Sequence, residues 1–317
     1  MKTVASIFVF GISLSSLLVA QSPTPSKTID LNKVKIYGQA CESKWRDGLS
    51  RLIWLDDRHF AAFHFAATCS DAREVAVFDS AGPAQAAARL DGLLSVSRGP
   101  RGTIAGVYPG KIDLLDTQLR LKQSLDCPNG PKGCWITLAP NSAFNSEFAV
   151  CSYADAQQVC GFYRDWPAEK ISSRTTAISG AEDPYTHAAY IGHPSWQVGN
   201  GETWFFDNGL LTRAGVGKAS SLVSSKDFAG KNGGHCEGQL SASEPLRFLA
   251  VCIGTHWYSD GMFDAIFGFS RVVLFDVPSG HQLVRINGPA FTSAAISPSG
   301  KRIAILRDSR VRLYEVD

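Results

Sequence analysis

The sequence predicts an all-β protein, and three observations carry this prediction. Residues that favour strands, the β-branched and aromatic ones, gather in short strips bounded by glycine- and proline-containing turns. Runs with the periodicity of an amphipathic helix are scarce, although the chain has 317 residues. A short apolar motif that ends in an acidic residue recurs along the chain, which indicates repeated β units.

The N-terminal segment 1–20 has the pattern of a secretory signal peptide. Lys2 gives a positive start, Val4–Val19 forms an apolar run, and Ala20 ends a small-residue cleavage site. We therefore expect a mature domain over 21–317 in a secreted or periplasmic location. The alternative is a retained N-terminal anchor, although the run is short for a membrane span. No second long apolar stretch follows, so no membrane span is expected after cleavage.

The eight cysteines all lie in the mature part, and an even number in an exported protein predicts disulfides. Eight cysteines allow about 105 connectivities, so we choose the pairs that the expected strands and loops bring within reach. The expected bridges are Cys41–Cys69, Cys127–Cys134, Cys151–Cys160 and Cys236–Cys252. A zinc site would need closely spaced cysteine pairs with histidines in register, so no metal and no other cofactor is expected.

The repeated motif consists of two apolar residues and an acidic one. Its clear copies end at Asp79, Asp116, Asp207, Asp276 and Glu315, and a weaker copy ends at Asp165. In chain order, with Asp165 included, consecutive acidic positions are separated by 37, 49, 42, 69 and 39 residues. Most of these spacings lie near the length of one four-stranded propeller blade, about 40–45 residues. Because the acidic position recurs once per unit, we interpret it as a turn or strand-end feature rather than as a catalytic group.

The C-terminal unit shows the pattern most clearly. Apolar strips at 294–296, 302–306 and 311–316 are separated by tight turns, the first of which contains Pro298 and Gly300. This unit resembles a WD-repeat or YVTN-type propeller blade, although the Trp-Asp and Gly-His signatures of WD repeats are absent. The resemblance implies an architecture and carries no activity.

Six acidic-ended motifs predict a single β-propeller of six blades. The last blade stops after its third strand, so we expect the N-terminal strand around Thr28–Lys35 to supply the fourth and close the ring. The 69-residue gap between Asp207 and Asp276 could hold a seventh blade, but we prefer an insertion at about 214–235. A β-sandwich built from similar strips is the alternative fold.

One segment, Thr255–Asp264, is unusual because its aromatic and acidic residues are not needed to complete a strand. We expect it to be a loop on the face of the ring that carries the long connections. Exposed Trp and Tyr offer large amphipathic contact areas. The candidate binding residues are His235, His256, Trp257, Tyr258 and Asp260. The structural alternative is that Trp257 and Phe263 plug the top of the ring.

Charge and motifs narrow the classes of function. The formal net charge is +2 and no basic run occurs, so neither nucleic acid nor an anionic membrane is implied as a partner. No HExxH and no GxSxG motif is present, and no catalytic residue is assigned. We predict a secreted, monomeric, non-catalytic binding propeller for an unknown protein, glycan or small molecule at the loop-rich face. The alternative is a propeller enzyme of the lactonase, glycan lyase or quinone-dependent dehydrogenase type, which would need acid/base groups or metal ligands converging from several blades.

Overall fold

The structure is a computed structural model of the chain. It describes residues 23–31, 50–65, 73–82, 84–130, 133–138, 147–154, 157–164, 167–177, 195–198, 202–207, 210–214, 220–223, 234–241, 246–259, 264–276, 279, 281–289 and 293–316.

The described strands form six four-stranded antiparallel sheets, each of which we call a blade. Blade 1 consists of β2 (Ser50–Trp54), β3 (His59–Phe65), β4 (Arg73–Asp79) and β5 (Ala84–Leu90), and blade 2 of β6 (Ser95–Arg98), β7 (Ile104–Tyr108), β8 (Lys111–Leu115) and β9 (Leu121–Asp126). Blade 3 consists of β10 (Cys134–Leu138), β11 (Glu147–Ala154), β12 (Gln157–Arg164) and β13 (Glu169–Ala177), and blade 4 of β14 (Ser195–Val198), β15 (Glu202–Asp207), β16 (Leu210–Ala214) and β17 (Ser220–Val223). Blade 5 consists of β18 (Gly234–Leu240), β19 (Arg247–Ser259), β20 (Asp264–Asp276) and β21 (Gln282–Pro289), and blade 6 of β22 (Ser293–Ile296), β23 (Arg302–Arg307), β24 (Arg310–Glu315) and β1 (Lys27–Asp30). One short 3-10 turn, Pro100–Gly102, connects β6 to β7.

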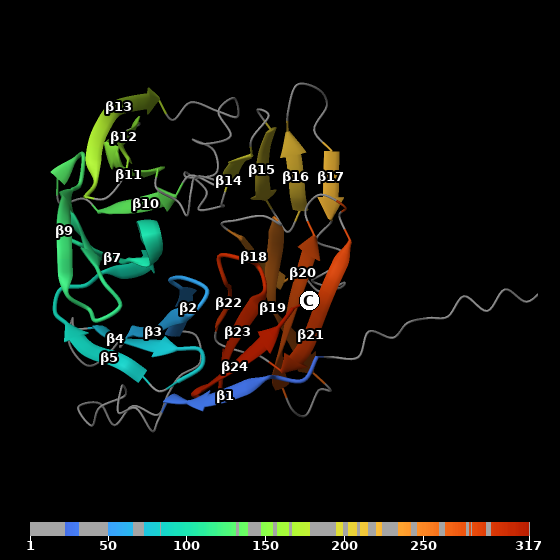
Figure 1. Cartoon of the computed structure of the whole chain (residues 1–317). Helices are drawn as coiled ribbons and strands as arrows, with labels where there is room; N and C mark the ends of the chain where they lie inside the picture. Colours follow the sequence, from blue (N-terminus) through green and yellow to red (C-terminus); the bar gives the residue numbers. More distant parts are fainter. Residues whose placement is uncertain are drawn as a thin grey trace, which may run out of the picture.

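The blades are arranged around a common centre with their first strands innermost (Figure 1). Strand β2 contacts both β22 and β6, and β18 contacts β22, so the first strands of blades 5, 6, 1 and 2 meet in that order. The amide N–H of Leu52 donates to Ser293 Oγ at 3.1 Å, and Trp54 Nε1 donates to the carbonyl of Ala295 at 3.2 Å. This architecture confirms the predicted all-β propeller class.

Strand β1 lies beside β24 at the outer edge of blade 6 (Figure 1). The two strands are antiparallel, with Lys27 opposite Leu313 and Asp30 opposite Arg310. The N-terminal strand was expected around Thr28–Lys35, whereas the structure has it at 27–30, followed by the buried Leu31. The fourth strand of the last blade is therefore supplied by the N-terminal part of the chain.

The hydrophobic core lies between blades because alternate residues of a strand point to opposite faces of its sheet. One cluster joins Phe63 and Val77 of blade 1 to Ile104 of blade 2, and another joins Leu249 of blade 5 to Ile303 of blade 6. The middle strands are consequently buried on both faces, as in the run Ile112–Leu115.

One sequence assignment changes. Asp79, Asp276 and Glu315 end the third strand of their blades, but the copy that ends at Asp207 belongs to β15, the second strand of blade 4. The third strand of blade 4 is β16, which has no acidic residue. The motif that ends at Asp207 therefore marks the second strand of its blade, whereas the sequence predicted the third. The insertion expected at about 214–235 stays a prediction: the described residues of this segment belong to β16, β17 and the beginning of β18, while 215–219 and 224–233 lie outside the described residues.

Candidate functional site

The repeated acidic residues organise turns, as predicted. Asp79 Oδ1 accepts the backbone N–H of Ala81 at 2.8 Å, and Asp116 Oδ1 accepts the N–H groups of Gln118 and Arg120 at 2.9 and 3.0 Å. Asp276 Oδ2 accepts the N–H of Ser279 at 3.0 Å. A carboxylate that caps the turn after its own strand is a structural device. Capping of a turn is therefore the role that the structure shows for Asp79, Asp116 and Asp276.

The acidic residue of blade 1 is also ion-paired. Arg58 Nε donates to Asp79 Oδ2 at 2.7 Å, and this hydrogen bond, together with the N–H of Ala81, lowers the pKa of Asp79 below its ordinary value. The carboxylate is therefore held in its charged form, which suits a permanent acceptor and not a general acid.

The short turns at one end of the ring bind neighbouring blades together. Arg247 Nη1 of blade 5 donates to the carbonyl of Gly300 in blade 6 at 3.0 Å, and the N–H of Ser299 donates to Asp57 Oδ1 of blade 1 at 2.8 Å. Arg302 Nη1 donates to the carbonyl of Asp57 at 2.6 Å. Burial lowers the pKa of Arg98 in blade 2 to about 10, and the charge of Asp57 opposes this shift. The polar groups of these turns therefore form hydrogen bonds that hold adjacent blades together.

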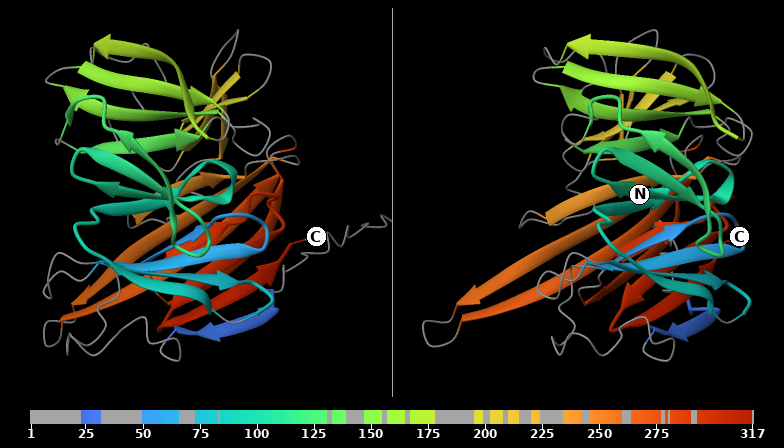
Figure 2. Two further views of the ribbon diagram at one scale, coloured as in Figure 1. Left: turned by 60° about the vertical axis from the view of Figure 1, so that its left-hand side comes forward. Right: turned by 90° about the vertical axis from the view of Figure 1, so that its left-hand side faces the viewer.

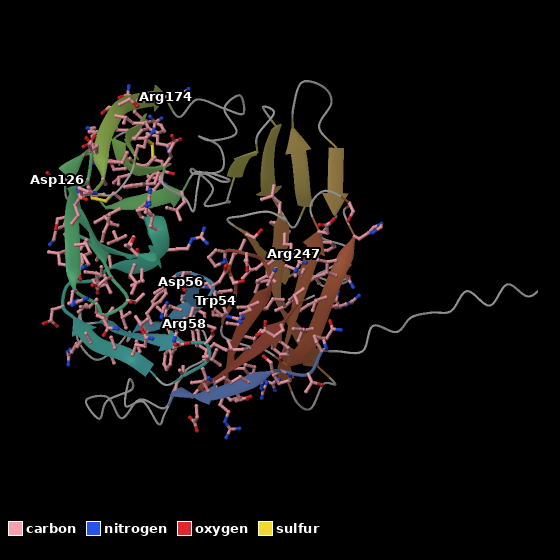
Figure 3. The ribbon with its side chains drawn as sticks, viewed as in Figure 1. Trp54, Asp56, Arg58, Asp126, Arg174 and Arg247 are labelled. Carbon is pink, nitrogen blue, oxygen red and sulfur yellow. A yellow bond between two sulfur atoms is a disulfide. The ribbon has the colours of Figure 1, made fainter. Side chains whose placement is uncertain are left out.

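The opposite end of blade 3 carries two disulfides, drawn in yellow in Figure 3. Cys127 and Cys134 bridge the connection between β9 and β10, with Cα atoms 5.7 Å apart. Cys151 and Cys160 face each other on β11 and β12, with Cα atoms 4.1 Å apart. Both bridges are those expected from the sequence. Beside them the rings of Trp135 and Tyr153 pack at 4.6 Å, an aromatic pair that the sequence analysis did not select.

The other four cysteines have different outcomes. Cys41 and Cys69 lie outside the described residues. Cys236 on β18 and Cys252 on β19 are directly opposite each other in the strand register. Their bridge stays a prediction.

The second conspicuous feature of this end is a two-stranded ribbon. Strands β19 and β20 have 13 residues each and pair along their whole length, from Arg247 opposite Asp276 to Ser259 opposite Asp264. Their neighbours stop earlier, since β18 pairs only as far as Gly254 and β21 only as far as Phe269. The ribbon, Thr255–Ser259 with Asp264–Gly268, therefore projects beyond the four-stranded part of blade 5 (Figure 2).

The ribbon corrects the expectation of a loop at Thr255–Asp264. Most of this segment is strand, and only 260–263, which include the candidate residue Asp260, lie outside the described residues. The physical reason is propensity: Thr, Trp and Tyr on β19 face Ile and Phe on β20, and all five favour strands. The strand-favouring residues of these two runs, on either side of a short connection that contains Gly261, were the signal that could have revealed a hairpin.

The register divides the candidate binding residues into two groups. Trp257 and Tyr258 are consecutive in a strand, so they belong to opposite faces of the ribbon. His256 shares the face of Tyr258. His235 is opposite Ile253, which shares the face of Trp257 and lies four residues before it. The site selected from sequence is thus two surfaces of one element.

No group of three or more His, Cys, Asp or Glu side chains that could hold a metal ion occurs within the described ranges. In the same ranges, no helix is long and apolar enough to cross a membrane. Asp126 and Arg174, on outer strands, lie at the periphery, whereas Trp54 lies towards the middle of the molecule (Figure 3).

Comparison with known proteins finds similarity in structure only. No protein-family model matches the chain, and no curated protein matches it. The chain resembles WD40-type β-propellers. It is similar to the β-propeller domain of Cps50 (Swd1) from Myceliophteria thermophila, with 12% identity, coverage of 87% of this chain and 99% of that chain, and a TM-score of 0.41.

Two further solved structures show the same likeness. The Pan2 WD40 domain of Neurospora crassa has 8% identity, covers 92% of this chain and 94% of its own, and gives a TM-score of 0.46. The β-propeller domain of the Trilobed protease from Pyrococcus furiosus has 10% identity, with 86% and 95% coverage and a TM-score of 0.42. The likeness concerns the fold alone, and the fold assignment stands on the strand pairing described above.

Proposed function

We propose that this protein is an exported, non-catalytic binding propeller that contacts a protein partner through the β19–β20 ribbon. The observation that carries the proposal is the ribbon itself. Its five residue pairs lie beyond the reach of β18 and β21, so they add no pairing to the remainder of the blade. A two-stranded ribbon alone is marginally stable in water, which makes a purely structural purpose a poor explanation.

The composition of the ribbon supports contact with a protein. Strand β19 of the ribbon carries His256, Trp257 and Tyr258, and strand β20 carries Ile266 and Phe267. Aromatic residues dominate the energetically important positions of protein interfaces. Each ribbon strand also has an edge that no described strand covers beyond Gly254 and Phe269, and an open strand edge can pair with an extended segment of a partner.

The disulfides support export. The two bridges in blade 3 fit an oxidising compartment such as the periplasm or the extracellular space. This agrees with the signal-peptide pattern of segment 1–20. The proposal therefore places the partner in that compartment.

The proposal is tested with Trp257→Ala, after capture of the partner from the envelope fraction with mature protein. We expect the variant to lose about 2 kcal/mol or more of affinity, as an interface anchor does, with little change in unfolding free energy. Leu283→Ala is a matched control, because this leucine is 40% exposed on β21 of the same blade and lies away from the ribbon. The control should leave both quantities unchanged.

The opposite outcome is equally clear. If Trp257 is a structural plug, its truncation should cost about 3–5 kcal/mol of stability and leave affinity unchanged. A second variant that replaces 255–268 with a short turn tests the element as a whole. If that variant folds and binds as tightly as the parent protein, the ribbon is not the contact surface.

A further inference from the structure

The hairpin between β23 and β24 in blade 6 brings two arginines directly opposite each other (Figure 1). Its turn consists of Asp308 and Ser309, which have positive φ angles of 50° and 57°, and the first pair beyond the turn is Arg307 with Arg310. Directly opposite residues of an antiparallel pair point to the same face of the sheet, and like charges in that position destabilise the pair. The two strands therefore place an unfavourable pair of charges beside the turn.

A third arginine lies on the same face. Arg312 follows Arg310 by two residues on β24, and Tyr314 follows by two more, so all three share one face. This face is turned toward blade 5, because Tyr314 belongs to the core cluster that joins blades 5 and 6. The side chain of Arg307 reaches blade 5 as well: a Cβ atom at Gly288 of β21 would lie 3.4 Å from Arg307 Nη1.

Carboxylates balance this charge in part. Asp308 Oδ2 lies 3.3 Å from Arg307 Nε, and the Asp308 side chain is 64% exposed. Asp30 of β1 is opposite Arg310 in the register. Three guanidinium groups thus share one face with two carboxylates, so the face keeps a surplus of positive charge.

The surplus is centred on Arg312, whose cross-strand neighbours are uncharged. It is opposite Thr28 on β1 and Ile305 on β23. Among the described residues, its guanidinium group makes no ion pair and no hydrogen bond. Burial raises the pKa of the Tyr314 hydroxyl, and the charges of Arg312 and Arg307 oppose that rise. Two guanidinium groups and one hydroxyl donor therefore lie in the same electrostatic neighbourhood.

We propose that Arg307, Arg310 and Arg312 form a binding site for a tetrahedral oxyanion, a phosphate or sulfate group. Guanidinium groups bind such groups through paired, charge-assisted hydrogen bonds. A tetrahedral group has more acceptor oxygens than a carboxylate, so several arginines can share it. Arg310 is exposed and Arg312 is half-buried, so the anion enters from solvent and meets a partly desolvated charge. The bound anion removes the repulsion across the hairpin.

The site lies at the foot of the ribbon but is complete without a partner. Gly288, which Arg307 approaches, is opposite Ser270 on β20, and the pairing of β21 with β20 ends at the next residue, Phe269. All three arginines come from blade 6. The inference is therefore independent of the proposed protein contact, and its test needs no partner.

The site is tested by calorimetric titration of the protein without segment 1–20 with sodium sulfate and sodium phosphate. The titrations are made at about pH 8, where phosphate is a dianion, and at an ionic strength held constant with sodium chloride. We expect saturable binding of both anions. Arg310→Gln and Arg312→Gln should each weaken it about tenfold, the loss expected for one charge-assisted contact. Acetate should bind more weakly than sulfate, and acetate binding as tight as that of sulfate would contradict a tetrahedral oxyanion site.

Arg164→Gln is the matched control, because it removes the same charge from an exposed arginine of blade 3 that is ion-paired with Glu147. Its titration should equal that of the parent protein. Equal weakening in Arg164→Gln and Arg310→Gln would reduce the effect to net charge and overturn the site. The absence of saturation up to about 50 mM, a concentration beyond ordinary weak sites, would overturn it as well.

Thermal unfolding adds a measurement that follows the repulsion itself. In sodium chloride alone, Arg310→Gln should melt at the same temperature as the parent protein or higher, because the variant lacks the like-charge pair. Exchange of chloride for sulfate should raise the melting temperature of the parent protein and of Arg164→Gln equally, and that of Arg310→Gln less. An equal rise in all three proteins would show that sulfate acts without this site.

Discussion

At the scale of single residues, the same carboxylate position performs the same task in successive blades. Asp116 is the clearest case, because its two oxygens receive the N–H groups of Gln118 and Arg120 and the side chains of Arg120 and Lys122. Burial alone would raise the pKa of Asp116, but these donors outweigh it and lower the pKa to about 2, against an ordinary value of 3.8. The charged form is therefore the one that the folded turn stabilises.

This shift predicts how Asp116→Asn behaves with pH. A carboxyl group whose pKa is lowered on folding stabilises the protein above its unfolded value near 3.8 and loses that contribution as pH falls through about 2. The variant keeps an acceptor oxygen but loses the charge, so at neutral pH it should unfold with about 1 kcal/mol less free energy. Urea unfolding at a series of acid pH values should show this difference shrinking below about pH 4.

Asp91→Asn provides the control, because the Asp91 side chain is 88% exposed and lies 3.7 Å from Arg89. Its stability should match that of the parent protein at every pH. A difference between Asp116→Asn and the parent that stayed constant down to the acid end would contradict the assigned turn role.

Residue roles could be predicted from sequence where they follow from recurrence. An acidic residue that returns once per unit is a turn feature, and this interpretation of Asp79, Asp116 and Asp276 is confirmed. The juxtaposition of Arg307 and Arg310 could not be predicted, because it depends on the register of β23 against β24. A register is a relation between two strands, and neither strand's sequence contains it.

At the scale of elements, the strands were easier to predict than their rank within a blade. In five of the described blades the pairing of the third and fourth strands contains a register shift, for instance at Val77/Phe78, Leu114/Leu115 and Leu274/Phe275. In these three examples the bulge falls between the two apolar residues of the motif, directly before its acidic residue. The motif therefore marks the place where the third strand bulges and then turns. The copy ending at Asp207 matched the composition but lies in a second strand, because alternation alone does not state a strand's place in the sheet.

The strand register sharpens one prediction about an element, the bridge between Cys236 and Cys252. These residues are direct partners on β18 and β19, the same relation that Cys151 and Cys160 have on β11 and β12. Because the second pair is bonded, directly opposite cysteines in this fold lie within reach of a disulfide. Peptide mapping of non-reduced mature protein should therefore recover a cross-linked peptide containing Cys236 and Cys252.

The peptide that contains Cys151 and Cys160 is the internal control for that mapping. Free thiols at Cys236 and Cys252, in a preparation where the control bridge is intact, would contradict the pairing. A cross-link from either residue to Cys41 or Cys69 would do so as well.

At the scale of the whole molecule, stability comes from the seams between blades. The seam between blades 6 and 1 is formed by Trp54 and Phe78 on one side and Leu306 and Leu313 on the other, with Leu31 of the N-terminal segment packed among them. The sequence indicated that a strand was missing from the last blade, and β1 supplies it. It could not indicate that Leu31 would be buried in this seam, because the contact joins residues nearly the whole chain apart.

The seam leads to the last prediction, that the N-terminal segment holds the first and last blades together. Leu31 is 0% exposed, and its N–H donates to the carbonyl of Ser309 at 2.8 Å. Leu31→Ala should therefore lower the unfolding free energy by about 2–5 kcal/mol, the range for a buried leucine. Leu121→Ala, at a leucine that is 57% exposed on β9, should cost little stability and serves as the control.

Deletion of 21–31 should lower the unfolding free energy more than Leu31→Ala does, because it also uncovers the edge of β24. Hydrogen exchange measured on the deletion variant should then rise in β24 and β2 while blade 3 stays protected. A deletion variant with the parent's stability and exchange pattern would show that the ring holds without its N-terminal strand.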